Sequence, residues 1–221
     1  MTIKTLALLG ATGLVGQQVV KEALAQGYHL RILARTPSKV KPHPNVTVIQ
    51  GDARDSESLD ILLKGAEAVV STLGPAGINQ SMKAARASAR DMPCFNSTRA
   101  LLPLLAKHNI RRFILTGGVS LKLPEDRNGF FMNFLLSRVA PRLLGDIYID
   151  REKEYELLQQ SDINWTVARC GAMDDAPSSK PLKTSGKKFQ GGKVSTHLLS
   201  RFLLDQVNDD QFVGKGVYMA S

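Results

Sequence analysis

Three glycines near the start of the sequence have a spacing that could bind a phosphate group. Gly10, Gly13 and Gly16 are three residues apart in LLGATGLVGQ, between an apolar run and a helix-like segment. A glycine turn between a strand and a helix points backbone N–H groups and the positive helix end at one spot, where a pyrophosphate binds. The alternative is a turn that only lets strand and helix pack closely. Its place in the first strand–helix unit favours the phosphate site, although the spacing is GxxGxxG and not GxGxxG.

The stretch LARTPSK follows about twenty residues later and holds a second group of polar side chains. Enzymes that use NAD place Asp or Glu at this point, against the ribose 2′-hydroxyl. LARTPSK has no acid, and its cations and hydroxyls suit the 2′-phosphate of NADP, which a carboxylate would repel. We therefore predict NADP(H) over NAD(H), against the alternative of an ordinary polar turn. The proposed donors are Arg35, Thr36, Ser38 and Lys39.

Two further predicted strands end in residues that suit a nucleotide site. Asp52 in GDARD, followed by Ala53, either accepts a hydrogen bond from the adenine amino group or is a plain turn aspartate. Thr72, Leu73 and Gly74 end the next strand, where glycine permits close approach of a cofactor. Since doubly wound sheets bind ligands beyond the carboxyl ends of their strands, we expect these residues at one edge.

Apolar runs of strand length alternate with helix-like segments along the whole chain. Their apolarity is continuous, which is typical of strands covered on both faces. Strands are predicted at 5–10, 30–34, 46–50, 68–73, 112–116 and 165–169, and helices at 14–26, at 56–64 and through LLPLLAKHN. The fold class predicted is α/β, a Rossmann-like doubly wound parallel sheet. We expect a single domain over 1–221, with substrate-side insertions near 121–145 and 174–193.

Composition narrows the class of protein. The 221 residues, 43% of them hydrophobic, bury one substantial core. No apolar stretch approaches the roughly 20 residues that span a bilayer, so we expect a soluble cytoplasmic protein with no membrane partner. Two cysteines without CxxC spacing suit a reducing compartment, and four scattered histidines form no metal-ligand pattern. No metal is predicted.

The formal charge of +9 raises the question of nucleic acid. Basic residues are spread along the chain, and their densest group lies in a Pro/Ser/Gly-rich stretch without aromatic residues for base stacking. This pattern disfavours nucleic acid and leaves a solvated loop face or attraction of anionic small molecules. The group comprises Lys180, Lys183, Lys187, Lys188 and Lys193.

GATGLVG, LARTPSK, GDARD, STLG and SDINWTVAR, the last preceded by Lys153, resemble atypical short-chain dehydrogenase/reductases of the NAD(P)H-binding type. The sequence is similar to biliverdin-IXβ reductase/flavin reductase and to NmrA-like proteins over nearly its whole length. The resemblance implies a three-layer α/β/α fold with NADPH in the crevice and the substrate stacked on the nicotinamide.

One feature of many short-chain dehydrogenases is missing. In Tyr-x-x-x-Lys the lysine lowers the phenol pKa, so that tyrosine exchanges a proton with an alcohol or ketone. Here Tyr148 is followed at that spacing by Glu152, and Tyr155 by Gln159. Alcohol/ketone interconversion by this mechanism is therefore disfavoured.

The predicted fifth strand ends in TGGVS, where the resemblance implies a Ser or Thr pair facing the nicotinamide. Thr116 keeps one hydroxyl, whereas Gly117 and Gly118 supply none. The candidate proton donors are then Thr116, Ser120, Lys153 or water. Lys153 is predicted to contact the ribose or act as an electrostatic helper, with a solvated helix surface as the alternative.

After the sixth strand, relatives continue Arg-Pro, whereas here Arg169 is followed by Cys170 and Gly171. Cys170 is expected to be a packing residue, with a nucleophile as the alternative.

The predicted catalytic residues are Thr116 and Lys153. The predicted cofactor-binding residues are Gly10, Thr12, Gly13, Leu14, Val15, Gly16, Arg35, Thr36, Ser38, Lys39, Asp52, Ala53, Thr72, Leu73, Gly74, Thr116, Gly117, Gly118, Lys153, Cys170 and Gly171.

Hydride transfer to a planar conjugated acceptor suits a site with few acid–base groups, because stacking and proximity supply much of the rate. We predict an NADPH-dependent reductase of flavin (FMN or FAD), biliverdin or another small planar or anionic substrate. The apolar cluster at 130–136 either covers the acceptor or forms a core or dimer-contact helix. Monomer and homodimer stay open. The alternative functions are a non-enzymatic NADP(H)-sensing regulatory protein and, third, a sugar-nucleotide epimerase-like enzyme.

Overall fold

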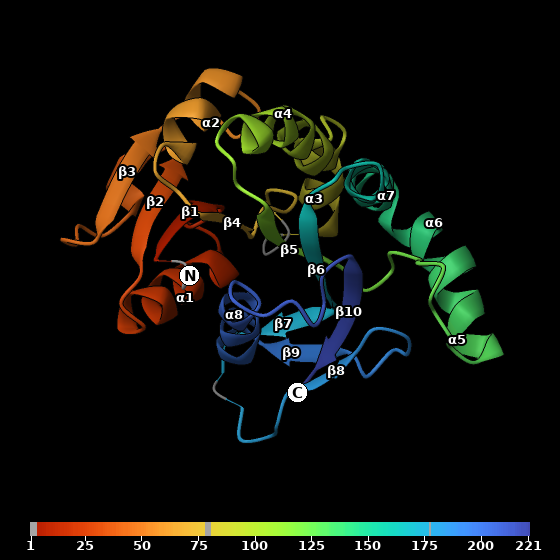
Figure 1. Ribbon diagram of the computed structural model, residues 1–221. Coiled ribbons are helices and arrows are strands. Elements are labelled where there is room, and N and C mark those ends of the chain that lie inside the picture. The colour runs from red at the N-terminus through yellow and green to blue at the C-terminus, as the bar shows by residue number, and fades with distance from the viewer. Residues whose placement is uncertain (1–3, 78–80, 177) are drawn as a thin grey trace.

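The computed structural model describes residues 4–77, 81–176 and 178–221, and within them ten strands form two sheets (Figure 1). The strands are β1 (Thr5–Leu9), β2 (His29–Ala34), β3 (Val46–Gln50), β4 (Ala68–Ser71), β5 (Arg112–Gly118), β6 (Asn164–Cys170), β7 (Ala172–Asp174), β8 (Lys183–Ser185), β9 (Lys193–Ser195) and β10 (Lys215–Ala220). The main sheet has the order β3-β2-β1-β4-β5-β6-β10-β8. It is parallel except for β8, which pairs antiparallel with β10, and β7 and β9 form a small parallel sheet.

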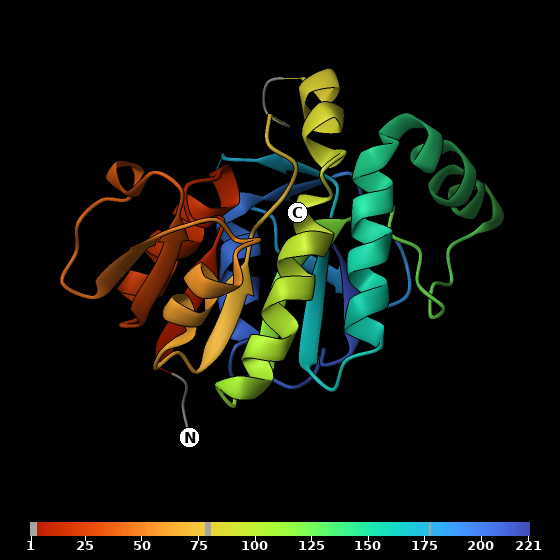
Figure 2. The same ribbon diagram turned by 90° about the horizontal axis from the view of Figure 1, so that it is seen from above.

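Helices cover both faces of the main sheet (Figures 1 and 2). They are α1 (Leu14–Ala25), α2 (Ser56–Leu63), α3 (Met82–Ala89), α4 (Pro93–Lys107), α5 (Phe130–Phe134), α6 (Ala140–Leu144), α7 (Asp146–Gln159) and α8 (Thr196–Asp205), with a 3₁₀ turn η1 (Pro37–Lys39) and a π turn η2 (Leu135–Val139). One layer consists of α1 packed on α8; the other contains α2, α4 and α7. The predicted three-layer, doubly wound α/β fold is confirmed.

Alternation along β1 explains the continuous apolar runs. Leu6 and Leu8 are buried in the core beneath α1 and α8, whereas Ala7 and Leu9 are buried in the core beneath α2, α4 and α7. Successive side chains of a strand point to opposite faces, so a strand covered on both faces needs apolar residues throughout. Strands β1 to β6 end at the same edge of the sheet, which we call the carboxyl edge.

Three details differ from the sequence prediction. Strand β4 ends at Ser71 and not at residue 73, which leaves Thr72 and Leu73 in the loop beyond it. The helical stretch after β4 is two helices, because Met92 takes a left-handed conformation (φ 45°) and Pro93 starts α4. Strand β10 was not predicted; it pairs with β6 and lies in the interior of the sheet.

The two predicted insertions differ in structure. Residues 130–144 form the run α5-η2-α6, which extends away from the body of the fold (Figures 1 and 2). Phe130 is 90% exposed, Phe131 71% and Phe134 51%, so the segment is not a core helix, while a cover over the acceptor and a dimer contact both stay predictions. The segment 174–193 contributes the edge strand β8 and the approach to β9.

Candidate functional site

The glycine turn is fixed by its contact with Thr72, the first residue after β4. Gly10 has φ +80°, and a Cβ built on it would lie 2.8 Å from the carbonyl carbon of Thr72. A Cβ on Gly16 would lie 2.1 Å from the Gly10 carbonyl oxygen. The Thr72 hydroxyl donates to that same oxygen at 3.1 Å. Glycine is therefore required at positions 10 and 16 for the turn itself.

The start of α1 is the part of this turn that is open to a ligand. Gly13 is the N-cap residue, no described side chain caps the helix, and the first turn carries no acid. Thr12 and Gly13 are exposed, while Leu14 is half-buried and Val15 is buried. The first amides of a helix lack intrahelical acceptors and attract anions. Because no side chain of the described residues caps these amides, this helix start fits a pyrophosphate.

The cations predicted to read the 2′-phosphate lie beyond β2, at the same edge. Arg35, Thr36, Ser38 and Lys39 are exposed in and around η1. Within the described part of the chain, neither Arg35 nor Lys39 has an ion-pair partner. Unpaired cations on an exposed turn are available to a phosphate group.

Asp52 is occupied within its own turn. Its carboxylate accepts from the Arg54 side chain at 2.9 and 3.0 Å and from the Arg54 backbone N–H at 2.9 Å. These hydrogen bonds hold the pKa of Asp52 below its usual value. The geometry favours the turn aspartate over a side-chain contact with adenine. Ala53, half-buried, packs against the core beneath α2 and α4.

The end of β5 carries few proton-transferring groups. Thr116 and Gly117 are buried and Gly118 is half-buried. A Cβ at Gly117 would lie 2.6 Å from Val167 Cγ1, so packing against β6 requires that glycine. A Cβ at Gly118 would meet nothing closer than the Ser120 hydroxyl, at 3.5 Å. Position 117 thus has no room for a serine, whereas position 118 has.

Lys153 does not point toward the end of β4. It is exposed on α7, with Nζ 5.9 Å from the ring centroid of Phe95 in the first turn of α4. Arg151 takes the inward position instead, and donates to the Leu73 carbonyl oxygen. Its guanidinium also lies 3.7 Å from where a Cβ on Gly74 would stand. Residues two apart on a helix point in nearly opposite directions, so Lys153 lies on the exposed side of α7, which favours the alternative of a solvated helix surface.

A buried polar network around Arg151 joins α7 to α4. Glu154 accepts from Arg151 at 2.6 Å and from the Thr98 hydroxyl at 2.8 Å. Asp150 accepts from the backbone N–H groups of Cys94 and Phe95, and so caps α4. Burial raises the pKa of Glu154, and the adjacent Arg151 opposes that shift. The network fixes the loop after β4, because Arg151 holds the Leu73 carbonyl.

The two tyrosines of α7 are not set up for proton exchange. The Tyr148 hydroxyl donates to Glu152 at 2.9 Å, and burial together with this carboxylate raises its pKa to about 12. Tyr155 is buried edge-to-face against Trp165, and burial raises its pKa to about 12. Both shifts are opposite to the lowered phenol pKa that Tyr-x-x-x-Lys produces.

The last residues of β6 and Gly171 after it are tightly packed. Cys170 is buried in the core beneath α1 and α8, and burial raises its thiol pKa to about 12. A thiol held neutral is a poor nucleophile, which supports the packing interpretation. A Cβ on Gly171 would lie 2.6 Å from the Gly192 carbonyl oxygen. On β6, the buried Arg169 pairs with Asp126 at 2.7 Å and holds the loop after β5.

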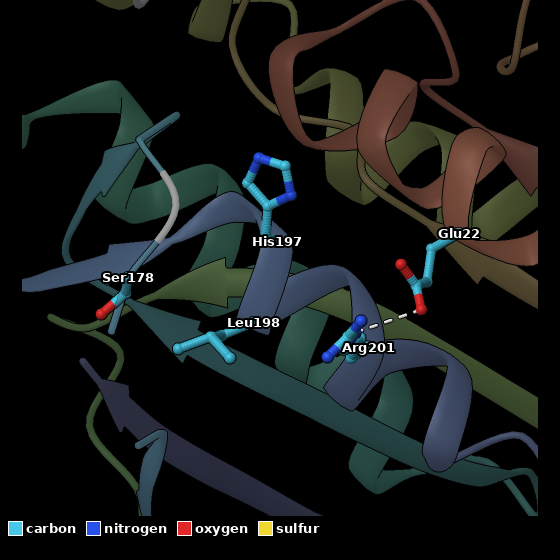
Figure 3. A pocket seen from close by; sticks show the side chains of 5 residues that line it. All are labelled: Glu22, Ser178, His197, Leu198 and Arg201. Atoms are coloured by element: carbon cyan, nitrogen blue, oxygen red, sulfur yellow. Dashed lines mark hydrogen bonds and ion pairs between the residues drawn. The ribbon is translucent and has the colours of Figure 1, made fainter. Parts of the chain in front are cut away.

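A cavity of about 210 Å³ lies away from these strand ends, between α1 and α8 (Figure 3). Its lining includes Glu22 and Arg201, which pair at 3.2 Å, and His197, whose ring bonds Gln18 at 2.8 Å. Its two charged side chains pair with each other and its histidine is bonded to Gln18, so it is not our candidate site. Within the described residues we find no helix able to cross a bilayer and no cluster of side chains suited to a metal ion.

Comparisons with known sequences come from a family model and from curated relatives. The NAD(P)H-binding family model matches residues 10–210. A phenylcoumaran benzylic ether reductase of Ginkgo biloba is 30% identical over an alignment of 90 residues that covers 36% of this chain and 29% of that protein. A 3-beta-hydroxysteroid dehydrogenase of Mycolicibacterium neoaurum is 24% identical over 118 residues, 51% and 31% of the two chains. The alignments thus span about a third of each curated relative.

Solved structures agree with this fold. A short-chain dehydrogenase/reductase of Veillonella parvula in complex with NADP superposes with a TM-score of 0.78 at 19% identity, covering 100% of this chain and 95% of that one. ChuY, an anaerobilin reductase of Escherichia coli O157:H7, gives 0.75 at 19% identity over 97% of both chains. A putative epimerase of Bacteroides thetaiotaomicron gives 0.77 at 18% identity over 99% and 97%. On the match to residues 10–210, the chain belongs to the NAD(P)H-binding family.

Proposed function

We propose that this protein is an NADPH-dependent reductase that transfers hydride to a flavin, biliverdin or another planar conjugated acceptor. The observation that carries the proposal is the contrast along the carboxyl edge. The start of α1 is uncapped and open to an anion, whereas β5 ends in one buried threonine hydroxyl and two glycines. A reaction that draws its proton from solvent suits such a site.

The residues of this chain have binding roles in the proposed reaction. The first amides of α1 hold the pyrophosphate, and Arg35 and Lys39 hold the 2′-phosphate. NADPH bound there supplies the hydride. Arg151 holds the Leu73 carbonyl and so fixes the loop after β4, beside which the nicotinamide would lie in this proposal. The Veillonella parvula neighbour that was crystallised with NADP supports this choice of cofactor.

The class of acceptor rests on what the site lacks. Tyr148 bonds Glu152, and its raised pKa leaves no tyrosine–lysine pair for alcohol or ketone chemistry. A conjugated ring system needs mainly stacking on the nicotinamide and a short hydride path. The name of the structural neighbour ChuY, an anaerobilin reductase, is consistent with such an acceptor.

A panel assay tests the proposal. Purified protein is mixed with NADPH or NADH and with FMN, FAD, biliverdin or a quinone, and absorbance is followed at the nicotinamide band. We expect NADPH consumption with at least one planar acceptor. NADPH binding without oxidation across the panel would contradict the reductase and favour the second candidate, an NADP(H)-sensing regulatory protein, which Gly117 and Gly118 at the end of β5 also suit. Epimerase-like activity stays the third alternative.

A further inference from the structure

The four most exposed large apolar side chains in the described part of the chain lie in the run α5-η2-α6, residues 130–144, which we call the arm. They are Phe130, Phe131, Phe134 and Leu143, the last of them 61% exposed. The arm extends away from the body of the fold, on the outer side of α7 (Figures 1 and 2). Single apolar residues are ordinary on a protein surface, whereas several gathered on one segment mark an interaction site.

The arm is basic as well as apolar. Residues 127–145 include three arginines and no acid. Arg138 and Arg142 are exposed, and neither has an ion-pair partner among the residues that the structure describes. The Arg142 guanidinium donates to the Arg138 carbonyl oxygen at 2.8 Å, so the two residues are neighbours on one side of the arm. Phe134 precedes Arg138 by the same four-residue step, which brings an aromatic ring next to the cations.

Further cations lie at the base of the arm. The Arg127 backbone N–H donates to the Lys187 carbonyl oxygen at 2.7 Å, and both side chains are exposed. This hydrogen bond places the basic loop after β8 beside the residues that lead into the arm. The positive charge of the arm therefore continues onto the body of the fold.

The acids near the arm do not cancel this charge. Asp126 and Asp146, which flank it, each pair with an arginine elsewhere in the fold, at 2.7 and 3.7 Å. Glu125 is exposed before the arm, and Glu152 is exposed on α7, where it accepts from the Tyr148 hydroxyl. The three arginines of 127–145 and the lysine at the base outnumber these two carboxylates.

An anionic bilayer surface matches both properties of the arm, whereas a second copy of the chain matches only its apolar character. In a two-fold dimer the same patch faces itself, so arginines would meet arginines between two chains of formal charge +9. Helical segments that combine Phe and Leu with Arg lie in the headgroup region of anionic membranes. The expectation of no membrane partner rests on the lack of a spanning segment, which does not test contact with a bilayer surface.

We propose that the arm docks this protein on the surface of a bilayer that contains anionic phospholipids. Phe130, Phe131 and Phe134 enter the headgroup region, and Arg138 and Arg142 contact the lipid phosphates. This docking is independent of the proposed reductase reaction, because it uses neither the glycine turn nor the end of β5.

Co-sedimentation of the full chain with vesicles tests the proposal. The vesicles consist of phosphatidylcholine alone, or of phosphatidylcholine with a third of its lipid replaced by phosphatidylglycerol. Each Lys or Arg near an anionic surface strengthens binding about fivefold. We therefore expect binding to the anionic vesicles that is at least about tenfold tighter than to the neutral ones, and that weakens at high salt. Equal binding to both vesicles, or no binding to either, would overturn the proposal.

Two double variants separate the aromatic and the cationic contributions. Phe130→Ser/Phe131→Ser should weaken binding to anionic vesicles at least about tenfold, because each ring loses apolar burial. Arg138→Gln/Arg142→Gln should weaken it about 10- to 30-fold and remove most of the preference for anionic lipid. Because these side chains are exposed, the thermal melting temperature should not change in either variant.

Matched controls lie at the other end of the sheet. Ile61→Ser removes an apolar side chain that is 40% exposed on α2. Lys21→Gln/Lys64→Gln removes two exposed cations from α1 and from the end of α2. Neither control should change vesicle binding by more than about twofold, since neither touches the arm. Losses equal to those of the arm variants would mean that general surface properties cause the binding, and would overturn the assignment to the arm.

A tryptophan placed in the arm distinguishes the bilayer from other occupants. Trp165 is buried, so the emission that Phe131→Trp adds over the wild-type protein reports the arm. We expect this emission to shift to the blue with anionic vesicles and to be quenched by brominated lipid. A shift caused instead by NADP⁺ and an acceptor would overturn docking in favour of a cover over the site. A dimer in light scattering that Phe130→Ser/Phe131→Ser converts to a monomer, without vesicle binding, would overturn it in favour of a second copy.

Discussion

The glycines after β1 and at the end of β5 differ in how tightly they are packed. After β1, packing requires glycine at both positions 10 and 16, whereas at the end of β5 it requires glycine at only one of two positions. Gly10 and Gly16 have no room for a side chain, because their Cβ atoms would meet Thr72 and the Gly10 carbonyl oxygen. At the β5 end, Gly117 is sterically required but Gly118 has space beside Ser120. The difference teaches that packing fixes the glycine turn, the proposed phosphate site, whereas the end of β5, the proposed hydride site, has room for a side chain at Gly118.

Gly16→Ala should have the largest effect on NADPH binding and stability, because it disrupts the glycine turn after β1. The added methyl group would lie 2.1 Å from the Gly10 carbonyl oxygen, so the turn must shift. We expect NADPH binding to be lost and the free energy of unfolding to fall by roughly 1–3 kcal/mol. Calorimetric titration and thermal melting measure the two effects. Gly129→Ala is the control, because that glycine has φ −62° and nothing within 4 Å of an added Cβ. Normal NADPH affinity in Gly16→Ala would refute the steric account.

Arg35→Glu should remove the preference for NADPH over NADH while leaving the glycine turn after β1 intact. A hydrogen bond to a charged group contributes about 1.5–3 kcal/mol, so NADPH affinity should fall roughly 10- to 100-fold. NADH affinity should change little, because NADH has no 2′-phosphate. Arg111→Glu makes the same charge change before β5, at the opposite edge of the sheet. Equal losses for both cofactors would show that Arg35 does not read the 2′-phosphate.

Two serine substitutions separate the glycines at the end of β5. Gly117→Ser places Cβ 2.6 Å from Val167 Cγ1, and should lower the free energy of unfolding by roughly 1–3 kcal/mol. Gly118→Ser should change it by less than about 0.5 kcal/mol, since the nearest atom is 3.5 Å away. Chemical denaturation of the two variants gives the difference. Equal destabilisation would mean that both positions are closed to a side chain.

Tyr148→Phe should have the smallest effect. Because burial and Glu152 raise the pKa of Tyr148 to about 12, the phenol stays protonated through pH 6–9 and does not titrate there. NADPH oxidation should therefore keep its rate within about twofold and show an unchanged pH profile, whereas loss of a general acid lowers rates about 10²- to 10⁴-fold. A loss of that size would show that Tyr148 acts as a general acid in the reaction.

The sequence predicts the parts of the site that backbone packing fixes better than the parts that depend on the direction of a side chain. The glycine turn and the alternation of strands and helices are visible in the sequence, because close packing and two-sided burial restrict residue types. Arg151 was not singled out from the sequence, although the pattern of α7 indicates its inward direction. Tyr155 and Leu158 mark the buried side of α7, and stepping back one turn from Tyr155 reaches Arg151. The exposure of Phe130 and the Arg54 partner of Asp52 depend on tertiary placement and local rotamers, which apolar periodicity does not report.

The most direct test of the central claim is a single-turnover measurement of hydride transfer. Protein saturated with NADPH is mixed in a stopped-flow instrument with the acceptor found in the panel, and the reaction is repeated with NADPH deuterated at the transferred position. We predict acceptor reduction that is slower with deuterium and whose rate is the same in Tyr148→Phe. NADPH that binds tightly but is not oxidised by any acceptor would contradict the account and identify the protein as a binder of the cofactor.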